Sequence, residues 1–125
     1  MGRGPKKILV VEDEKPIARA LELKLKSAGF ETAIALDGEV ALDLLKKEKF
    51  DLVILDLVVP KVDGFGILES LVAKKNKTPV VVISNLSQGE DISRVEAFGV
   101  KDYFVKSDVP LTDVVRRVQE ILEAQ

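Results

Sequence analysis

Four short apolar runs in this chain each lead directly into polar side chains, and no other feature of the sequence constrains the fold as strongly. Short runs that are apolar throughout are typical of parallel strands that are buried on both faces of a sheet. The carboxyl ends of such strands open into one crevice of an open α/β sheet, so the polar residues there are expected to converge. They are Glu12 and Asp13 after residues 8–11, Asp56 after residues 52–55, Ser84 after residues 80–83, and Lys106 after residues 103–105.

Amphipathic segments alternate with these runs and predict helices between the strands. The clearest apolar stripe runs from Leu111 to Leu122, and the weakest helix is expected over Gln88–Phe98. A further strand, less apolar and without a reactive side chain at its end, is expected over Glu31–Ala35. The alternation predicts an α/β fold of the (βα)5 type, a doubly wound, flavodoxin-like parallel sheet of strand order 2-1-3-4-5. This order places the strand at residues 31–35 on an edge.

Composition narrows the class of protein. The chain has 125 residues, no cysteine, no histidine and a net charge of −2, and we expect one domain at residues 7–125 after a flexible leader at residues 1–6. The charge balance argues against nucleic-acid binding and a polybasic membrane anchor, and no apolar stretch approaches the ~20 residues of a spanning helix. The lack of cysteine agrees with a reducing interior, so a cytoplasmic protein is expected. Without histidine, any phosphohistidine donor must belong to another protein.

The expected crevice has the chemistry of a metal and phosphoryl site. Glu12 and Asp13 beside Asp56 would repel one another strongly unless a hard divalent cation lay among them, and Mg²⁺ suits such oxygen ligands. Taken without Asp56, the first two acids are better explained as an acidic helix cap, because Glu14 follows them; Asp56 reverses that preference.

The other polar residues suit phosphoryl transfer. Asp56 could attack phosphorus and form an acyl phosphate, while Lys106 supplies positive charge to the phosphoryl oxygens. Ser84 could donate a hydrogen bond there or simply cap its strand. Most other lysines lie near expected helix carboxyl ends and are interpreted as offsetting the helix dipole: Lys46, Lys47, Lys49, Lys74, Lys75 and Lys77.

In this order the residues resemble the receiver domain of bacterial two-component response regulators, over about Lys7–Leu122. The resemblance is carried by Val10–Glu14, Asp37–Leu42, Leu55–Gly64, Ser84, Gly99–Phe104 and Lys106. It implies that Asp56 accepts a phosphoryl group from a histidine kinase or a phosphotransfer protein. It also implies roles for further residues: Mg²⁺ ligation by Asp13, Asp56 and the backbone carbonyl of Val58, with Glu12 acting through water; phosphoryl contacts from Ser84 and Lys106; and an aromatic switch at Tyr103.

Two positions depart from the family pattern. Ser107 stands where the family usually has a proline, often after a cis bond, and a trans Lys106–Ser107 bond is predicted because a cis non-proline bond costs about 3–4 kcal/mol. Asn85 is bulkier than the very small residue that the family favours after its serine or threonine, and it is expected to narrow access to Asp56. Val58 and Leu86, both apolar, are expected to flank the phosphoryl position and to hinder the attack of water.

These features favour a phosphoacceptor switch that controls an unknown downstream protein through its fourth helix, fifth strand and fifth helix. Such a switch is not an enzyme beyond its own phosphorylation and dephosphorylation, and it is expected to be a monomer or a weak homodimer. A degenerate receiver that binds proteins without phosphorylation is the alternative. A phosphatase of the aspartyl-phosphate type is less consistent with the sequence, because such enzymes have a second acid two residues after the nucleophile and this chain has Val58 there. No output domain follows residue 125, so a stand-alone regulator is expected, although truncation from a longer regulator stays open.

Overall fold

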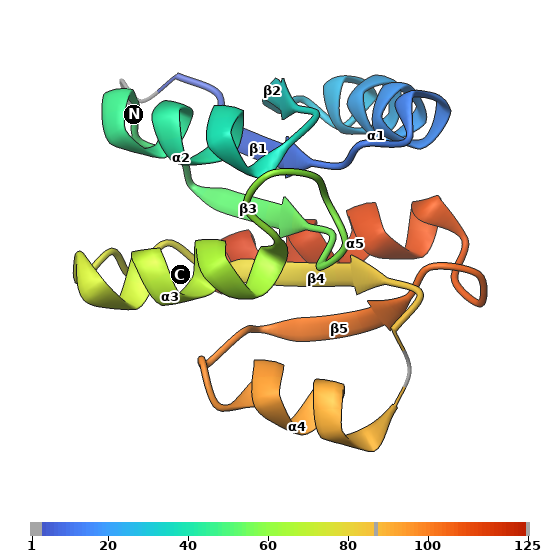
Figure 1. Ribbon diagram of the computed structural model, residues 1–125. Helices are drawn as coiled ribbons and strands as arrows, with labels where there is room; N and C mark the ends of the chain where they lie inside the picture. Colours follow the sequence, from blue (N-terminus) through green and yellow to red (C-terminus); the bar gives the residue numbers. More distant parts are fainter. Residues whose placement is uncertain (1–3, 87, 125) are drawn as a thin grey trace.

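In the part of the chain that the computed structural model describes, residues 4–86 and 88–124, five parallel strands form one sheet in the order β2-β1-β3-β4-β5 (Figure 1). The predicted fold class and strand order are therefore confirmed. The strands are β1 (Lys7–Val11), β2 (Glu31–Ala35), β3 (Leu52–Leu55), β4 (Val80–Ser84) and β5 (Asp102–Val105). The helices are α1 (Lys15–Ser27), α2 (Gly38–Lys47), α3 (Gly64–Ala73), α4 (Gly89–Glu96) and α5 (Leu111–Glu123).

Alternate residues of the central strands supply two separate cores. Ile8 and Val10 of β1 pack with α1 and α5 on one face of the sheet, whereas Leu9 and Val11 pack with α2 and α3 on the other. Helix α4 adds Val95 to the second core and covers the β5 end of that face (Figure 1). Strands β1, β3 and β4 are almost entirely buried, while β2 and β5 are only partly covered, as expected for the two edges of the sheet.

The helix ends largely follow the sequence signals. Asp37 and Asp63 cap α2 and α3 by accepting hydrogen bonds from the backbone N–H groups of Val40 and Gly66, both at 2.9 Å. The predicted helix over residues 88–98 is shorter in the structure, since α4 ends at Glu96. The next three residues form a turn that Gly99, at a φ of 80°, completes in the left-handed region.

The ends of the chain add little to this picture. The predicted flexible leader at residues 1–6 falls partly on residues 1–3, which lie outside the described part, and it stays a prediction. No helix of the described residues combines the length and apolar character needed to cross a bilayer.

The loop between β3 and α3 is packed so tightly that glycine is required at its end. The backbone N–H of Gly64 donates to the carbonyl of Leu57 at 2.9 Å. A Cβ atom on Gly64 would lie 2.6 Å from the Cα of Leu57 and 2.9 Å from the carbonyl oxygen of Asp56. Both neighbours are backbone atoms, so they cannot give way without moving the loop that follows Asp56.

Gly64→Ala is therefore expected to lower the free energy of unfolding by about 1–3 kcal/mol, through overpacking against this backbone. Gly89→Ala is the matched control, because a Cβ there would meet nothing within 4 Å. Urea unfolding followed by circular dichroism measures both variants. Equal stability of the two variants would contradict the proposed steric constraint.

Candidate functional site

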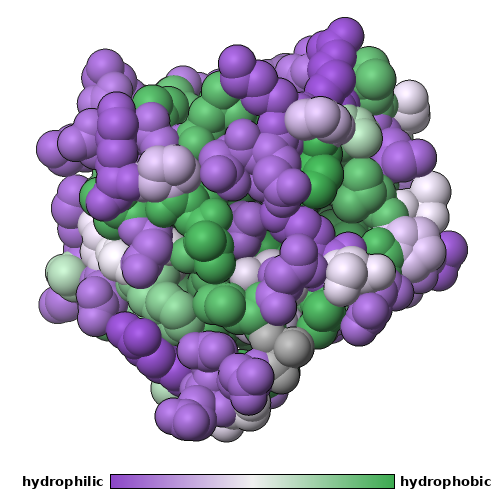
Figure 2. Space-filling view, turned by 45° about the vertical axis from the view of Figure 1, so that its right-hand side comes forward, coloured by the Kyte–Doolittle hydropathy of each residue, from purple (hydrophilic) through white to green (hydrophobic). Residues whose placement is uncertain are grey.

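The polar residues at the carboxyl ends of the strands meet in one place, as the sequence predicts. The strand register pairs Val11 with Leu55 and Ser84 with Val105, so the residues that follow these strands become neighbours. Several of them, together with residues of the adjoining loops, line a cavity of about 310 Å³. Its lining residues are Asp13, Glu14, Asp56, Val58, Asn85, Leu86 and Lys106. Figure 2, in which the right-hand side of Figure 1 comes forward, shows hydrophilic side chains interspersed with hydrophobic ones on this side of the molecule.

Three carboxylates form a compact group beside this cavity. One oxygen each from Glu12, Asp13 and Asp56 lies within 4.8 Å of the others. Glu12 is fully buried and Asp56 is 3% exposed, whereas Asp13 faces solvent. Burial raises the pKa of Glu12, the nearby charge of Asp56 raises it further, and Lys106 and the N–H of Glu14 partly oppose the shift. Negative charge in this group is therefore costly without a cation.

The acids fit Mg²⁺ on the evidence of one buried atom. Glu12 Oε2 accepts the backbone N–H of Glu14 at 3.0 Å. Glu12 Oε1 lies 2.9 Å from Lys106 Nζ, but no described donor points at it with hydrogen-bond geometry. A buried carboxylate oxygen without a hydrogen bond is costly, and a hard cation or one of its waters would satisfy it.

Lys106 is the centre of the charge network. Its Nζ lies 2.6 Å from Asp56 Oδ2 and 2.6 Å from Glu14 Oε2, in addition to its approach to Glu12. Burial alone would lower the pKa of Lys106, but the three carboxylates outweigh it and the pKa is raised. The ammonium is thus held charged next to the predicted nucleophile.

Glu14 is a partner that the sequence analysis did not single out. It occupies the N-cap position of α1, yet its side chain makes no cap hydrogen bond. The carboxylate reaches instead to Lys106, which is 92 residues further along the chain. The only sequence signal was its place beside Glu12 and Asp13, which suits a helix cap equally well.

Ser84 and Tyr103 meet at the loop that follows β4. Ser84 is fully buried, is not among the residues that line the cavity, and accepts the backbone N–H of Leu86 at 3.4 Å. The hydroxyl of the half-buried Tyr103 donates to the carbonyl of Leu86. Burial raises the pKa of Tyr103, and the charge of Asp91 adds to the shift. Both predicted residues therefore contact one short segment beside the cavity.

The two departures from the family pattern turn out to be linked. No peptide bond in the described part of the chain is cis, so the predicted trans Lys106–Ser107 bond is confirmed. The N–H of Ser107 donates to the side-chain oxygen of Asn85 at 2.9 Å. A proline at residue 107 would have no N–H to donate. Asn85 lines the cavity, and its predicted effect on access to Asp56 stays a prediction.

The two residues predicted to flank the phosphoryl position lie beside the cavity, and their effect on the attack of water stays a prediction. Val58 and Leu86 both line the cavity, and the Val58 side of it is open because 58% of that residue is exposed. The N–H of Val58 donates to Asp56 Oδ1 at 3.1 Å, which orients the carboxylate. The predicted metal ligation by the Val58 carbonyl stays a prediction.

Comparisons with known proteins agree on one family. The family model described as "Response regulator receiver domain" matches residues 8–119. A "Probable transcriptional regulator ycf27" of Porphyridium aerugineum is 38% identical over 120 residues, which cover 91% of this chain and 50% of the relative. The "Cell cycle response regulator CtrA" of Brucella ovis is 37% identical over 100 residues, covering 80% of this chain and 43% of the relative. The chain thus spans about half the length of the curated relatives it matches.

Solved structures give the same answer. The receiver domain of Francisella response regulator 1452 superposes with a TM-score of 0.88 at 30% identity, covering 95% of this chain and 98% of that one. A CheY-like receiver domain protein from Methanospirillum hungatei JF-1 superposes with a TM-score of 0.89 at 23% identity, and the match covers 97% of this chain and 96% of that one. At this identity it supports the fold alone.

The contact between Glu14 and Lys106 predicts a measurable shift. Glu14→Gln removes one of three anions beside the ammonium, so the raised pKa of Lys106 should fall towards its ordinary value, while Asp56 keeps it from falling completely. Titration of the Lys106 side chain by NMR measures its pKa in both proteins. Glu22→Gln, which removes the partner of Arg19 and Lys26 on α1, is the control and should leave Lys106 unchanged. An unchanged pKa in Glu14→Gln would argue against the contact.

Proposed function

Because this chain belongs to the response regulator receiver domain family, we propose that it is a cytoplasmic phosphoacceptor switch of a two-component system. One observation carries the proposal: Asp56 is buried at the edge of a cavity, grouped with two further carboxylates, and its Oδ2 lies 2.6 Å from Lys106 Nζ. A carboxylate in these surroundings has the neighbours that phosphoryl transfer requires.

In the proposed reaction a carboxylate oxygen of Asp56 attacks the phosphorus of a phosphohistidine on a histidine kinase or phosphotransfer protein. An O–P bond forms, the N–P bond breaks, and the imidazole nitrogen leaves with the electron pair and takes a proton from solvent. The donor belongs to a partner because this chain has no histidine. Lys106 already contacts Asp56, so its ammonium needs only a small movement to meet an oxygen of the incoming phosphoryl group.

Mg²⁺ would be held by the carboxylates of Asp13 and Asp56 and the backbone carbonyl of Val58. Glu12 would reach it through a water molecule. When bound, the ion neutralises the carboxylates and the phosphoryl oxygens that approach them. The buried Glu12 Oε1, which accepts no hydrogen bond from a described residue, and the grouping of the three carboxylates support this assignment. Asp56 itself is oriented by two contacts, since the N–H of Val58 donates to its Oδ1 and Lys106 Nζ donates to its Oδ2.

The output is proposed to begin at Leu86. Ser84 accepts the N–H of this residue and Tyr103 donates to its carbonyl. A phosphoryl group on Asp56 would offer the Ser84 hydroxyl an acceptor, and the loop and Tyr103 would then rearrange together. The surface formed by α4, β5 and α5 would in turn change its affinity for an unknown downstream protein. Phosphorylation in this view biases a conformational equilibrium that the domain already has.

A phosphorylation-independent receiver is the second candidate. The observation that favours it is the Asn85–Ser107 hydrogen bond, which places a bulky amide at the cavity and ties together the loops after β4 and β5. In that case the same surface would bind its partner protein constitutively. An enzymatic role is not proposed beyond the chain's own phosphorylation and dephosphorylation, and a monomer or weak homodimer is expected.

Incubation with Mg²⁺ and acetyl phosphate, followed by intact mass measurement, tests the leading proposal. We expect one stable phosphoryl adduct in the wild type and none in Asp56→Asn. Asp43→Asn, at an exposed acid on α2, is the control and should keep the adduct. Absence of an adduct in the wild type would favour the constitutive receiver, and continuous hydrolysis of acetyl phosphate would favour a phosphatase.

The apolar flanks of the cavity are expected to slow hydrolysis of the phosphorylated form. Val58→Asn or Leu86→Asn should speed decay on the order of fivefold, which corresponds to roughly 1 kcal/mol of barrier, because a polar side chain can hold the attacking water. Decay is followed by intact mass after removal of the donor. Val72→Asn, at a 59% exposed valine on α3, is the control. Unchanged decay in both cavity variants would remove this explanation.

A further inference from the structure

Lysines are concentrated at the end of the sheet opposite Asp56, where the strands begin. Here the carboxyl ends of α2 and α3 and the loops that precede β3, β4 and β5 come together. Six exposed lysines of this region make no ion pair with any described residue, and they are Lys46, Lys49, Lys74, Lys75, Lys77 and Lys101. A seventh, Lys47, pairs with Asp43 at 3.0 Å.

The helix dipole explains only part of this charge. Lys46 and Lys74 lie at the ends of α2 and α3, where cations are favoured. Lys49, Lys77 and Lys101 lie in loops beyond any helix end. These three lysines make no ion pair with any described residue, so an anionic partner would be attracted to them.

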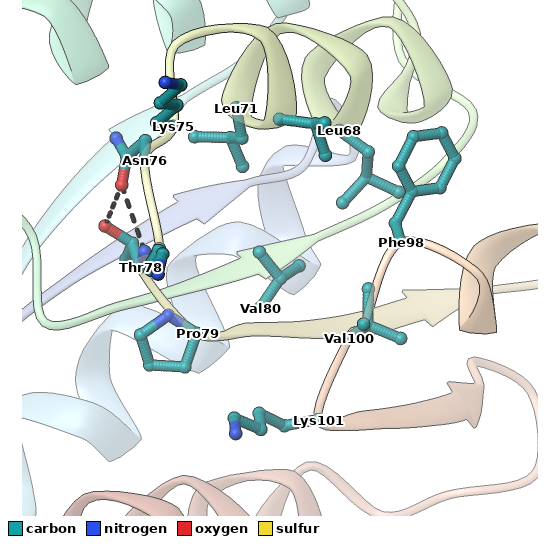
Figure 3. A pocket seen from close by; sticks show the side chains of 13 residues that line it. Leu68, Leu71, Lys75, Asn76, Thr78, Pro79, Val80, Phe98, Val100 and Lys101 are labelled. Carbon is teal, nitrogen blue, oxygen red and sulfur yellow. Dashed lines mark hydrogen bonds between the residues drawn. The ribbon is translucent and has the colours of Figure 1, made fainter.

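An apolar cleft of about 430 Å³ opens next to these lysines, between α3 and the segment that leads into β5. Figure 3 shows Leu68 and Leu71 from α3, Val80 from β4, and Phe98 and Val100 from the segment before β5 arranged around it. Its volume is within the roughly 300–1,000 Å³ range of ligand-binding clefts and exceeds that of the Asp56 cavity.

The rim of the cleft combines positive charge with an unusual backbone. Lys75, Lys77 and Lys101 line it. Lys75 has a φ of 54°, in the left-handed region that favours glycine, and the chain ends α3 there with hydrogen bonds from Lys75 N–H to Val72 and from Asn76 N–H to Leu71. The turns after α1 and α4 place glycine at the equivalent point, Gly29 and Gly99. A lysine is thus held where a glycine would be less strained.

The rest of the rim is fixed by a short hydrogen-bonded loop. The side-chain oxygen of Asn76 accepts the backbone N–H of Thr78 at 3.0 Å and its hydroxyl at 2.6 Å (Figure 3). This loop holds Lys77 and Pro79 beside the cleft, so the site is largely formed before any ligand arrives.

We propose that this cleft is the docking site of an acidic protein segment that places a bulky apolar side chain among Leu68, Leu71 and Phe98. Aspartate or glutamate residues on either side of that side chain would pair with the surrounding lysines. Complementary charge would bring the segment to this edge, and burial of the apolar side chain would supply most of the affinity.

Other ligand classes match the surface less well. A small carboxylate would use one or two of the lysines and leave the rest, which extend from Lys46 to Lys101, without a role. A nucleic acid brings no aliphatic group to fill the cleft, and Phe98 is the single aromatic ring among its lining residues. A protein segment satisfies both the spread of the charge and the aliphatic walls.

The test uses a synthetic peptide with a Leu-Phe pair flanked by runs of glutamate, titrated into the ¹⁵N-labelled protein. We expect saturable NMR shift changes centred on residues 46–49, 68–80 and 98–101. A matched peptide with serines in place of Leu-Phe should bind at least tenfold more weakly. No binding at millimolar peptide, shifts spread over the whole surface, or equal binding of the serine peptide would each overturn the proposal.

Two variants separate the site from general electrostatics and from folding defects. Lys75→Gly should weaken peptide binding several-fold and yet raise the melting temperature by about 3 °C, because it relieves the left-handed lysine. Lys24→Glu, at another exposed and unpaired lysine on α1, should leave binding unchanged. Loss of binding in Lys24→Glu, or full binding in Lys75→Gly, would contradict the assignment. Binding to vesicles of anionic phosphatidylglycerol is measured as well. If the wild type binds these vesicles more tightly than the peptide, the ligand is a membrane and the proposal is overturned.

Discussion

The ammonium of Lys106 lies between carboxylates that come from distant parts of the chain, and the edge of the sheet is organised around this contact. Glu12 and Glu14 arrive from the end of β1, Asp56 from the end of β3, and Lys106 from the end of β5. Three carboxylates contact the ammonium, and the exposed Asp13 adds a fourth to the group, so the group carries a net charge of −3 when all are ionised. Burial raises the pKa of Glu12, and the neighbouring charge of Asp56 adds to the shift. The same excess of negative charge in a buried place favours a bound divalent cation such as Mg²⁺.

The apolar layers make this costly arrangement possible. Strands β1, β3 and β4 are buried on both faces, and their fixed parallel register determines where the polar residues after them must lie. The loop after Asp56 is held just as tightly, since Gly64 packs directly on the backbone of Asp56 and Leu57. Packing therefore preorganises the site.

Sequence reasoning reached the parts of this structure that depend on periodicity and strand order. Apolar runs predicted the strands, and the shared edge of a parallel sheet brought Asp56 and Lys106 together without knowledge of any loop. Contacts that depend on side-chain direction were not accessible. From the sequence, Glu14 is explained as well by a helix cap as by a contact with Lys106. The Asn85–Ser107 hydrogen bond could be predicted only from the conformations of two loops. The early end of α4 follows from the turn at Gly99, which local propensity indicated only approximately.

The lysine-rimmed cleft shows a different limit of sequence reasoning. Each lysine considered singly suits a helix end or a solvated loop, and only the fold brings six unpaired ones to the same edge beside an apolar cavity.

Helix α4 provides a physical connection between the Asp56 cavity at the carboxyl ends of the strands and the lysine-rimmed cleft at their amino ends. Its one buried residue is Val95, and Arg94 packs over the Phe65 ring at 4.0 Å. The helix follows the Leu86 segment, and the chain after it continues into Phe98 and Val100 on the cleft wall. A rearrangement at Leu86 that shifts α4 would therefore change the shape of the cleft. Linkage requires the converse as well: a segment that fits the cleft better with α4 in one position would favour the matching state of Asp56 by the same free energy.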